Sequence, residues 1–128
     1  MDSRIRLLLV DDEARVRQGL RMCMASEPDF DVIGEAEEGE GAVMLASEIH
    51  PDVVVLDLRM RGLDGFGAAK QLAVTEPSAK VVILSMQDDS GTRREALASG
   101  ASAFVGKQEG IPRLFEVIRA IAGRADGS

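Results

Sequence analysis

Five short apolar runs recur along this chain, and their alternation with longer stretches restricts its fold more than any other feature. The runs are IRLLLV, FDVIGEA, VVVL, VVIL and ASAFV. In the stretches that follow them, apolar residues recur at intervals of three and four, which is the period of an α-helix. Strands that alternate with helices form βαβ units, and such units build a parallel sheet. The sequence therefore predicts an α/β fold, with a five-stranded parallel sheet and helices on both of its faces.

The composition of the runs indicates the order of the strands. The first, third and fourth runs are continuously apolar, as in strands covered on both faces, whereas the second and fifth alternate. The second run places Asp31 between Phe30 and Val32, and the fifth places Ser102 beside Ala103. We therefore expect the second and fifth strands at the edges of the sheet. Right-handed crossovers then favour the strand order 2-1-3-4-5.

The helical stretches differ in the apolar surface that they offer. The last stretch has a continuous stripe, formed by Leu114, Val117, Ile118 and Ile121. Phe115 and Ala122 lie off this stripe and hint at an interface on its exposed side. The fourth stretch has a thin stripe, formed by Ala96, Leu97 and Ala98. Its Arg93 and Arg94 are interpreted as a solvated face. We expect this helix to be the least firmly held, because most helix stability comes from packing one face.

The chain has 128 residues, a length that fits a single domain. We expect residues 1–124 to form it and residues 125–128 to be a tail or the start of a linker. No apolar run approaches the ~20 residues of a membrane helix, so no membrane association is expected. The net charge of −7 argues against direct binding of nucleic acid. A single cysteine, Cys23, cannot form an internal disulfide, which favours a reducing, cytoplasmic location.

Acidic residues stand at the ends of two strands that the predicted order makes neighbours. Asp11 and Asp12 follow the first strand, and Asp57 ends the third. In an open parallel sheet, ligands bind beyond the carboxyl ends of the strands where the strand order reverses, which here lies between these two strands. Three carboxylates that meet in one crevice repel one another. Oxygen ligands of this kind favour a hard cation, so we predict a Mg²⁺ site.

Two further polar residues follow the remaining strands. Ser85 ends the fourth strand, and Lys107 comes soon after the fifth. Carboxylates, a hydroxyl and an ammonium together suit a phosphoryl group. The metal and Lys107 would neutralise phosphoryl oxygens, Ser85 would donate a hydrogen bond to one of them, and an aspartate would be the nucleophile.

These residues resemble the receiver domain of two-component response regulators. The resemblance runs from IRLLLVDDEARVRQGL through VVVLDLRMRGLDG and VVILSMQDD to SGASAFVGK. It implies the flavodoxin-like (βα)5 fold and makes Asp57 the phosphoacceptor. It also implies that Asp12 is the main acidic Mg²⁺ ligand, that Asp11 helps directly or through water, and that the backbone carbonyl of Arg59 completes the protein ligands.

The resemblance also implies a switch. Ser85 and Lys107 would take the roles given above, and Phe104 matches the aromatic position that swings inward when the hydroxyl moves. A sensor histidine kinase would donate the phosphoryl group, and the surface of the fourth helix, fifth strand and fifth helix would then shift. The chain would catalyse its own phosphotransfer and autodephosphorylation, and no other enzymatic activity is expected. Gln108 departs from the family pattern, because many members carry Pro after the lysine.

The phrases EPDFDVIGEAEEGEGA, HPDVVVLDLRM and GASAFVGK most resemble the NarL/FixJ (LuxR-type) class. Receivers of that class usually precede a helix-turn-helix DNA-binding domain, which these residues do not contain. The chain is therefore interpreted as an excised receiver, with a stand-alone receiver as the alternative. DNA would be reached only through the missing C-terminal domain, and output would pass through a homodimer or a contact with another domain.

Plainer interpretations stay open at single residues. Asp11 and Asp12 can cap the following helix, and Phe104 can be an ordinary core residue. An aspartyl-nucleophile phosphatase is the alternative enzyme, but it needs a second acid two residues after the nucleophile, where this chain has Arg59. A flavodoxin needs a hydroxyl- and glycine-rich phosphate loop after the first strand, where DDEAR would repel phosphate unless a metal ion lay between them. A degenerate receiver that never accepts phosphate is the remaining alternative.

Overall fold

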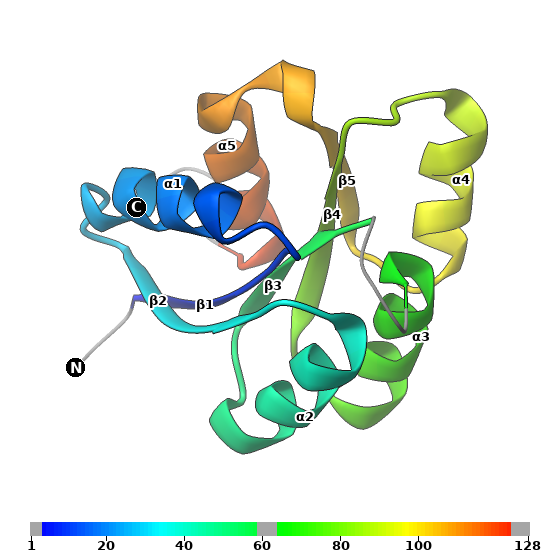
Figure 1. Cartoon of the computed structure of the whole chain (residues 1–128), viewed down its shortest axis with the longest axis horizontal. Coiled ribbons are helices and arrows are strands. Elements are labelled where there is room, and N and C mark those ends of the chain that lie inside the picture. The colour runs from blue at the N-terminus through cyan, green and yellow to red at the C-terminus, as the bar shows by residue number, and fades with distance from the viewer. Residues whose placement is uncertain (1–3, 59–63, 124–128) are drawn as a thin grey trace.

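The computed structural model describes residues 4–58 and 64–123, and these form one parallel sheet with helices on both faces (Figure 1). The strands are β1 (Ile5–Val10), β2 (Phe30–Ala36), β3 (Val53–Asp57), β4 (Lys80–Ser85) and β5 (Ala103–Gly106). They pair in the order β2-β1-β3-β4-β5, and every pairing is parallel. The predicted fold class, strand order and edge strands are therefore confirmed.

Five α-helices connect and follow the strands. They are α1 (Ala14–Ala25), α2 (Gly39–Ile49), α3 (Gly65–Thr75), α4 (Ser90–Ala98) and α5 (Ile111–Ile121), with a short 3-10 turn, η1 (Lys107–Glu109), before α5. No helix in the described ranges is long and apolar enough to cross a membrane. The predicted tail, residues 125–128, lies outside the described residues.

The sheet separates two apolar clusters, because successive side chains of a strand point to opposite faces. Leu7 and Leu9 of β1 join the cluster under α1 and α5, whereas Leu8 and Val10 join the cluster under α2, α3 and α4. The helices of the second cluster contribute mainly small residues, namely Ala42, Ala46, Ala68, Ala69, Leu72 and Ala96. The α1 and α5 side is packed with larger residues, which include Leu20, Met24, Leu114, Phe115 and Ile118.

The contrast between the fourth and last helices is as the sequence predicts, with one correction. Of the residues of α4, all of which the structure describes, Ala96 alone is buried, while α5 buries four large residues. The prediction that Phe115 lies on an exposed side was wrong, because this ring is only 7% exposed. It packs edge-on against Phe30 of β2, with 5.0 Å between the ring centroids. The edge strand thus widens the surface that α5 covers.

Glycine lets α3 begin directly beside the end of β3. A Cβ atom at Gly65 would lie 2.7 Å from the Cα of Leu58 and 2.8 Å from the carbonyl oxygen of Asp57. Contacts this short are not tolerated by any other residue type without a backbone shift. The carboxylate of Asp64 caps the same helix by accepting from the N–H of Gly67 at 2.7 Å. The close approach of α3 therefore helps to fix the backbone at Asp57.

Candidate functional site

Three carboxylates meet at the carboxyl edge of the sheet. Asp11 and Asp12 follow β1 and Asp57 ends β3, and one oxygen from each lies within 4.8 Å of the others. These strands are neighbours, with Val10 paired opposite Leu56. Asp11 is 3% exposed and Asp57 8%, while Asp12 is exposed. The predicted convergence of the three aspartates is confirmed, and it follows from the strand order rather than from their spacing in the sequence.

Lys107 brings a positive charge into this pocket. Its Nζ atom lies 3.6 Å from Oδ2 of Asp11 and 3.7 Å from Oδ1 of Asp57. The lysine begins η1, directly after the last residue of β5, so its side chain starts at the same edge as the carboxylates. One ammonium against three carboxylates leaves the pocket with an excess of negative charge. The site can therefore accept a further cation.

Burial raises the pKa of Asp11 above its ordinary value of 3.8, and the charges of Asp12 and Glu13 act in the same direction. Two contacts oppose this rise in pKa: the N–H of Glu13, which donates to Oδ1 of Asp11 at 2.9 Å, and the ammonium of Lys107. The ionised carboxylate is thus held in the pocket at a cost, which a bound cation would relieve.

The donor atoms fit a hard divalent cation. All three clustered side chains offer carboxylate oxygens, which Mg²⁺ prefers, whereas zinc sites use cysteine and histidine. The single histidine, His50, instead pairs with Glu76. The fourth predicted ligand, the backbone carbonyl of Arg59, lies outside the described residues. Asp11, Asp12 and Asp57 therefore form a pocket that can bind a metal ion.

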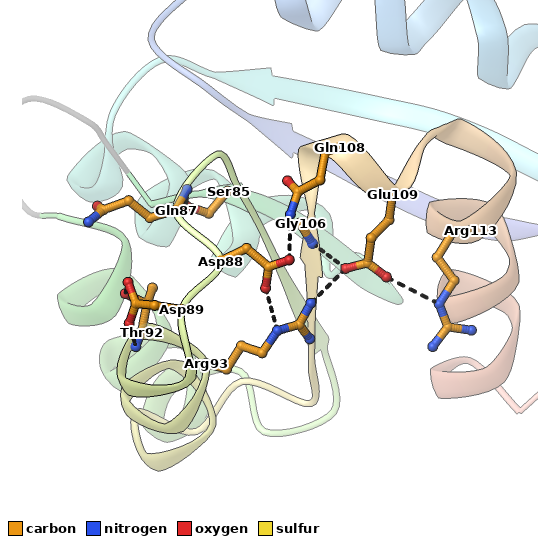
Figure 2. Close-up of polar contacts among 10 residues, drawn as sticks. All are labelled: Ser85, Gln87, Asp88, Asp89, Thr92, Arg93, Gly106, Gln108, Glu109 and Arg113. Atoms are coloured by element: carbon orange, nitrogen blue, oxygen red, sulfur yellow. Dashed lines mark hydrogen bonds and ion pairs between the residues drawn. The ribbon is translucent and has the colours of Figure 1, made fainter.

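Ser85 lies at the same edge, on the strand next to Asp57. In the sheet register Asp57 pairs with Leu84, and Ser85 pairs with Gly106. The hydroxyl is 2% exposed and accepts the N–H of Gln87 at 3.0 Å, so its own proton can still be donated (Figure 2). The predicted placement of a hydroxyl beside the acidic pocket is consistent with this register.

Phe104 lies on β5, two residues before its end, and is 9% exposed. It belongs to the cluster under α2, α3 and α4, so the interpretation of Phe104 as a core residue is confirmed. The guanidinium of Arg93 covers the ring, with its Cζ atom 4.8 Å from the ring centroid.

Arg17 supports the pocket and was missed in the sequence. Its Nη1 atom donates to the backbone oxygen of Asp11, and its Nε atom donates to Oε1 of Glu35 at 3.0 Å. The residue thereby ties the loop after β1 to the edge strand β2. A sequence signal is weak, because Glu35 lies 18 positions away and the neighbouring Arg15 and Arg21 have the same charge.

Comparison with known proteins gives consistent results. A family model described as the response regulator receiver domain matches residues 7–119. The transcriptional regulatory protein DegU of Brevibacillus brevis is 32% identical over 121 residues, which cover 94% of this chain and 51% of DegU. LiaR of Bacillus subtilis, also named a transcriptional regulatory protein, is 37% identical over 116 residues, which cover 91% of this chain and 55% of LiaR. The chain thus spans about half the length of the curated relatives that it matches.

Solved structures agree in fold. A LuxR-family two-component response regulator from Aurantimonas sp. SI85-9A1 superposes with a TM-score of 0.90 at 33% identity, covering 94% of this chain and 86% of that chain. The response regulator domain of Thermotoga maritima CheB superposes with a TM-score of 0.85 at 34% identity, covering 94% and 97%. The strand order and helix placement described above are shared with these proteins.

Proposed function

This chain belongs to the response regulator receiver domain family, and from that membership we propose that Asp57 accepts a phosphoryl group in the presence of Mg²⁺. The observation that carries the proposal is the meeting of Asp11, Asp12 and Asp57 within 4.8 Å, with the ammonium of Lys107 beside them. A nucleophilic carboxylate, acidic metal ligands and a fixed cation in one pocket are the parts that phosphoryl transfer requires.

In the proposed reaction, an oxygen of Asp57 attacks the phosphorus of a phosphohistidine on a sensor histidine kinase. The new O–P bond forms as the P–N bond breaks, and the electron pair of the P–N bond returns to the imidazole nitrogen. Asp11, Asp12, Asp57 and the backbone carbonyl of Arg59 would hold Mg²⁺, which supplies positive charge to the phosphoryl oxygens when it is bound. Beyond this transfer and the later hydrolysis of the aspartyl phosphate, the chain has no proposed enzymatic activity.

Two other side chains complete the proposed site. Lys107, which pairs with Asp11 and Asp57, would pair with a phosphoryl oxygen once the group is attached. Ser85 would donate its hydroxyl proton to another oxygen. Such groups stabilise developing charge because they are already fixed in place before the reaction. Movement of Ser85 toward the phosphoryl group would then be followed by Phe104.

We propose that phosphorylation changes the surface formed by α4, β5 and α5, by favouring one of two existing conformations. Output would pass through a homodimer or through a contact with another domain. LuxR-family regulators and transcriptional regulatory proteins are among the similar proteins, so a helix-turn-helix domain that binds DNA is the proposed output partner. We also propose a cytoplasmic location, and a stand-alone receiver is the alternative to a receiver with an output domain.

The proposed phosphorylation is tested with acetyl phosphate and Mg²⁺, followed by intact mass. We expect one added phosphoryl group on the wild type, none on Asp57→Asn, and none after chelation of the metal. Asp31→Asn is a matched control, because Asp31 lies on the edge strand β2 and pairs with Arg4 outside the pocket. Uptake that persists in Asp57→Asn or in the chelated protein would contradict the proposal, as would no uptake by the wild type.

The metal site is tested separately by Mg²⁺ titration with backbone amide NMR. We expect the largest shifts at Asp11, Asp12 and Asp57 and a weaker affinity in Asp11→Asn. Shifts spread evenly over the chain would contradict a site at these residues.

A further inference from the structure

One arginine joins the loop that follows Ser85 to the turn η1, which begins at Lys107 (Figure 2). Arg93, on α4, donates through Nε to Oδ1 of Asp88 and through Nη2 to Oε2 of Glu109 at 2.8 Å. Asp88 stands three residues after Ser85, in the loop between β4 and α4, and Glu109 ends η1, which begins at Lys107. Arg93 therefore bridges the two loops. Its side chain is 39% exposed, so it does lie on a solvated face, but its two carboxylate partners were not predicted.

The second loop is held by the same carboxylate. Oε2 of Glu109 also accepts the N–H of Gly106 at 2.7 Å, which closes the turn around Lys107. This N–H and the guanidinium of Arg93 hold the pKa of Glu109 below its ordinary value of 4.5, so the carboxylate stays ionised at neutral pH. On the other side, the amide of Gln108 donates to Oδ2 of Asp88. The backbone on both sides of Lys107 is thus tied to the loop of Ser85.

Charge explains why the arginine is needed. Asp88 and Glu109 both pair with the guanidinium of Arg93, and Arg113 also contacts Glu109, at 3.7 Å. Removal of Arg93 would leave Arg113 to offset the charge of Glu109 alone, and the two carboxylates would repel each other. The two carboxylates repel, since the charge of Asp88 acts to raise the pKa of Glu109. The packing of α4 against the sheet would do little to prevent a movement of the helix, since Ala96 is the one buried residue of this fully described helix. Without Arg93, this repulsion would be opposed mainly by the hydrogen bond from Gln108 to Asp88, so we expect the two loops to shift apart.

A third contact of Arg93 lies between the loops. Its guanidinium covers the ring of Phe104, with Cζ 4.8 Å from the ring centroid. Phe104 precedes Gly106 on β5, so the arginine also holds the strand from which the Lys107 loop starts. The loop after β4, the turn after β5 and the ring between them share this one side chain.

We propose that Arg93 is a positioning residue for phosphotransfer, because it pairs with both Asp88 and Glu109 and so keeps Ser85 and Lys107 within reach of one phosphoryl group. The inference rests on the proposed phosphorylation of Asp57. It assigns no contact between Arg93 and the phosphoryl group. The arginine acts through the two carboxylates and the loops that carry them.

The test compares rate constants for phosphorylation by acetyl phosphate at saturating Mg²⁺, measured by intact mass. We expect Arg93→Gln to be slower by about five- to tenfold, since small displacements of positioned groups cost large factors in rate. Arg93→Lys keeps a cation between the carboxylates and should retain most of the rate. Arg94→Gln is the matched control, because it removes the same charge from an exposed position of the same helix and should leave the rate unchanged.

A double variant separates charge repulsion from a general loss of structure. Arg93→Gln combined with Asp88→Asn removes the facing charge but keeps an oxygen that Gln108 can donate to, so its rate should return to within about twofold of the wild type. Raising the salt concentration should also shrink the defect of Arg93→Gln, because it screens the repulsion. The Mg²⁺ affinity of Arg93→Gln should not weaken, since the carboxylates that pair with Arg93 are those of Asp88 and Glu109.

Each result supports or overturns the inference. It is overturned if Arg93→Gln phosphorylates at the wild-type rate, if Arg94→Gln is equally slow, or if the double variant stays as slow as Arg93→Gln. A folding check by circular dichroism accompanies each variant. If Arg93→Gln does not fold, Arg93→Lys and the double variant decide, and a slow double variant counts against the proposal. Failure of the wild type to take up phosphate refutes the proposed function instead.

Discussion

Arg119 and Arg93 make the same set of contacts at the two helices that pack against β5. Arg119, on α5, pairs with Asp29 at 2.8 Å and with Glu27 at 2.6 Å, and its Cζ atom lies 4.6 Å from the ring centroid of Phe30. Arg93, on α4, pairs with two acids and covers Phe104 in the same way. In each cluster one guanidinium contacts two carboxylates and one phenyl ring, and in the Arg93 cluster Arg113 also contacts Glu109.

The two clusters differ in what surrounds them. The helix of Arg119 buries four large residues, so its position is already fixed by packing, and the ion pairs add stability at a site far from the acidic pocket. The helix of Arg93 buries one alanine, and its ion pairs join loops at the edge of the pocket. The same interaction therefore stabilises a well-packed region but determines geometry in a thinly packed one.

Truncation of buried side chains tests the difference in packing most strongly. Ile118 of α5 is fully buried, and we expect Ile118→Ala to lower the free energy of unfolding by about 3 kcal/mol. Ala96→Gly on α4 should cost only about 1 kcal/mol, mainly through helix propensity. Urea unfolding measures both values. Equal losses would show that α4 is held as firmly as α5.

Hydrogen exchange tests the same difference without a substitution. The amides of α4 should exchange at least about tenfold faster than those of α5, because local opening exposes little apolar surface. The measurement is native-state exchange followed by NMR at low denaturant. Protection of α4 as high as that of α5 would contradict the comparison.

Removal of Arg119 tests whether its ion pairs stabilise the fold without affecting the acidic pocket. Arg119→Gln should lower the free energy of unfolding by about 1 kcal/mol, a modest value because all three charged side chains are partly exposed. The rate of phosphorylation by acetyl phosphate should stay at the wild-type value, in contrast to Arg93→Gln. A slower rate in Arg119→Gln would show that the two arginines do not differ in role.

The pH dependence of stability tests the contribution of Glu109 to the Arg93 cluster, and this is the smallest effect that we expect. The pKa of Glu109 is lowered in the folded protein, so its ionised form adds stability above the ordinary value of 4.5, and that stability is lost as the pH falls through the folded-state pKa. Glu109→Gln should be less stable by a few tenths of a kcal/mol at pH 7, as is usual for exposed ion pairs.

We expect this difference between Glu109→Gln and the wild type to stay constant down to about pH 5.5 and then to shrink at lower pH. Urea unfolding over a pH series measures it. Glu116→Gln is the control, because Glu116 is highly exposed and pairs with the same Arg113 that contacts Glu109. A difference that grows in acid would mean that the sign of the pKa shift is wrong.

Sequence reasoning succeeded where a backbone rule connects pattern to position. Continuous and alternating apolar runs separated inner from edge strands, and the order of strands then brought Asp11, Asp12 and Asp57 to one edge. It failed for Phe115, whose burial depends on Phe30 of a distant strand. It did not predict the partners of Arg93, because Asp88 and Glu109 lie five positions before it and 16 after it.

The sequence by itself determined the sheet, its order, and the acidic and basic residues at the strand ends, because strand geometry and right-handed crossovers leave few alternatives. Only the tertiary structure decided which long side chains bridge between loops. An arginine can reach a carboxylate from many places on a helix, and the partner it meets depends on how closely two loops approach. That approach is set by packing of the whole domain, so Arg17 and Arg93 acquire their partners only in the folded chain.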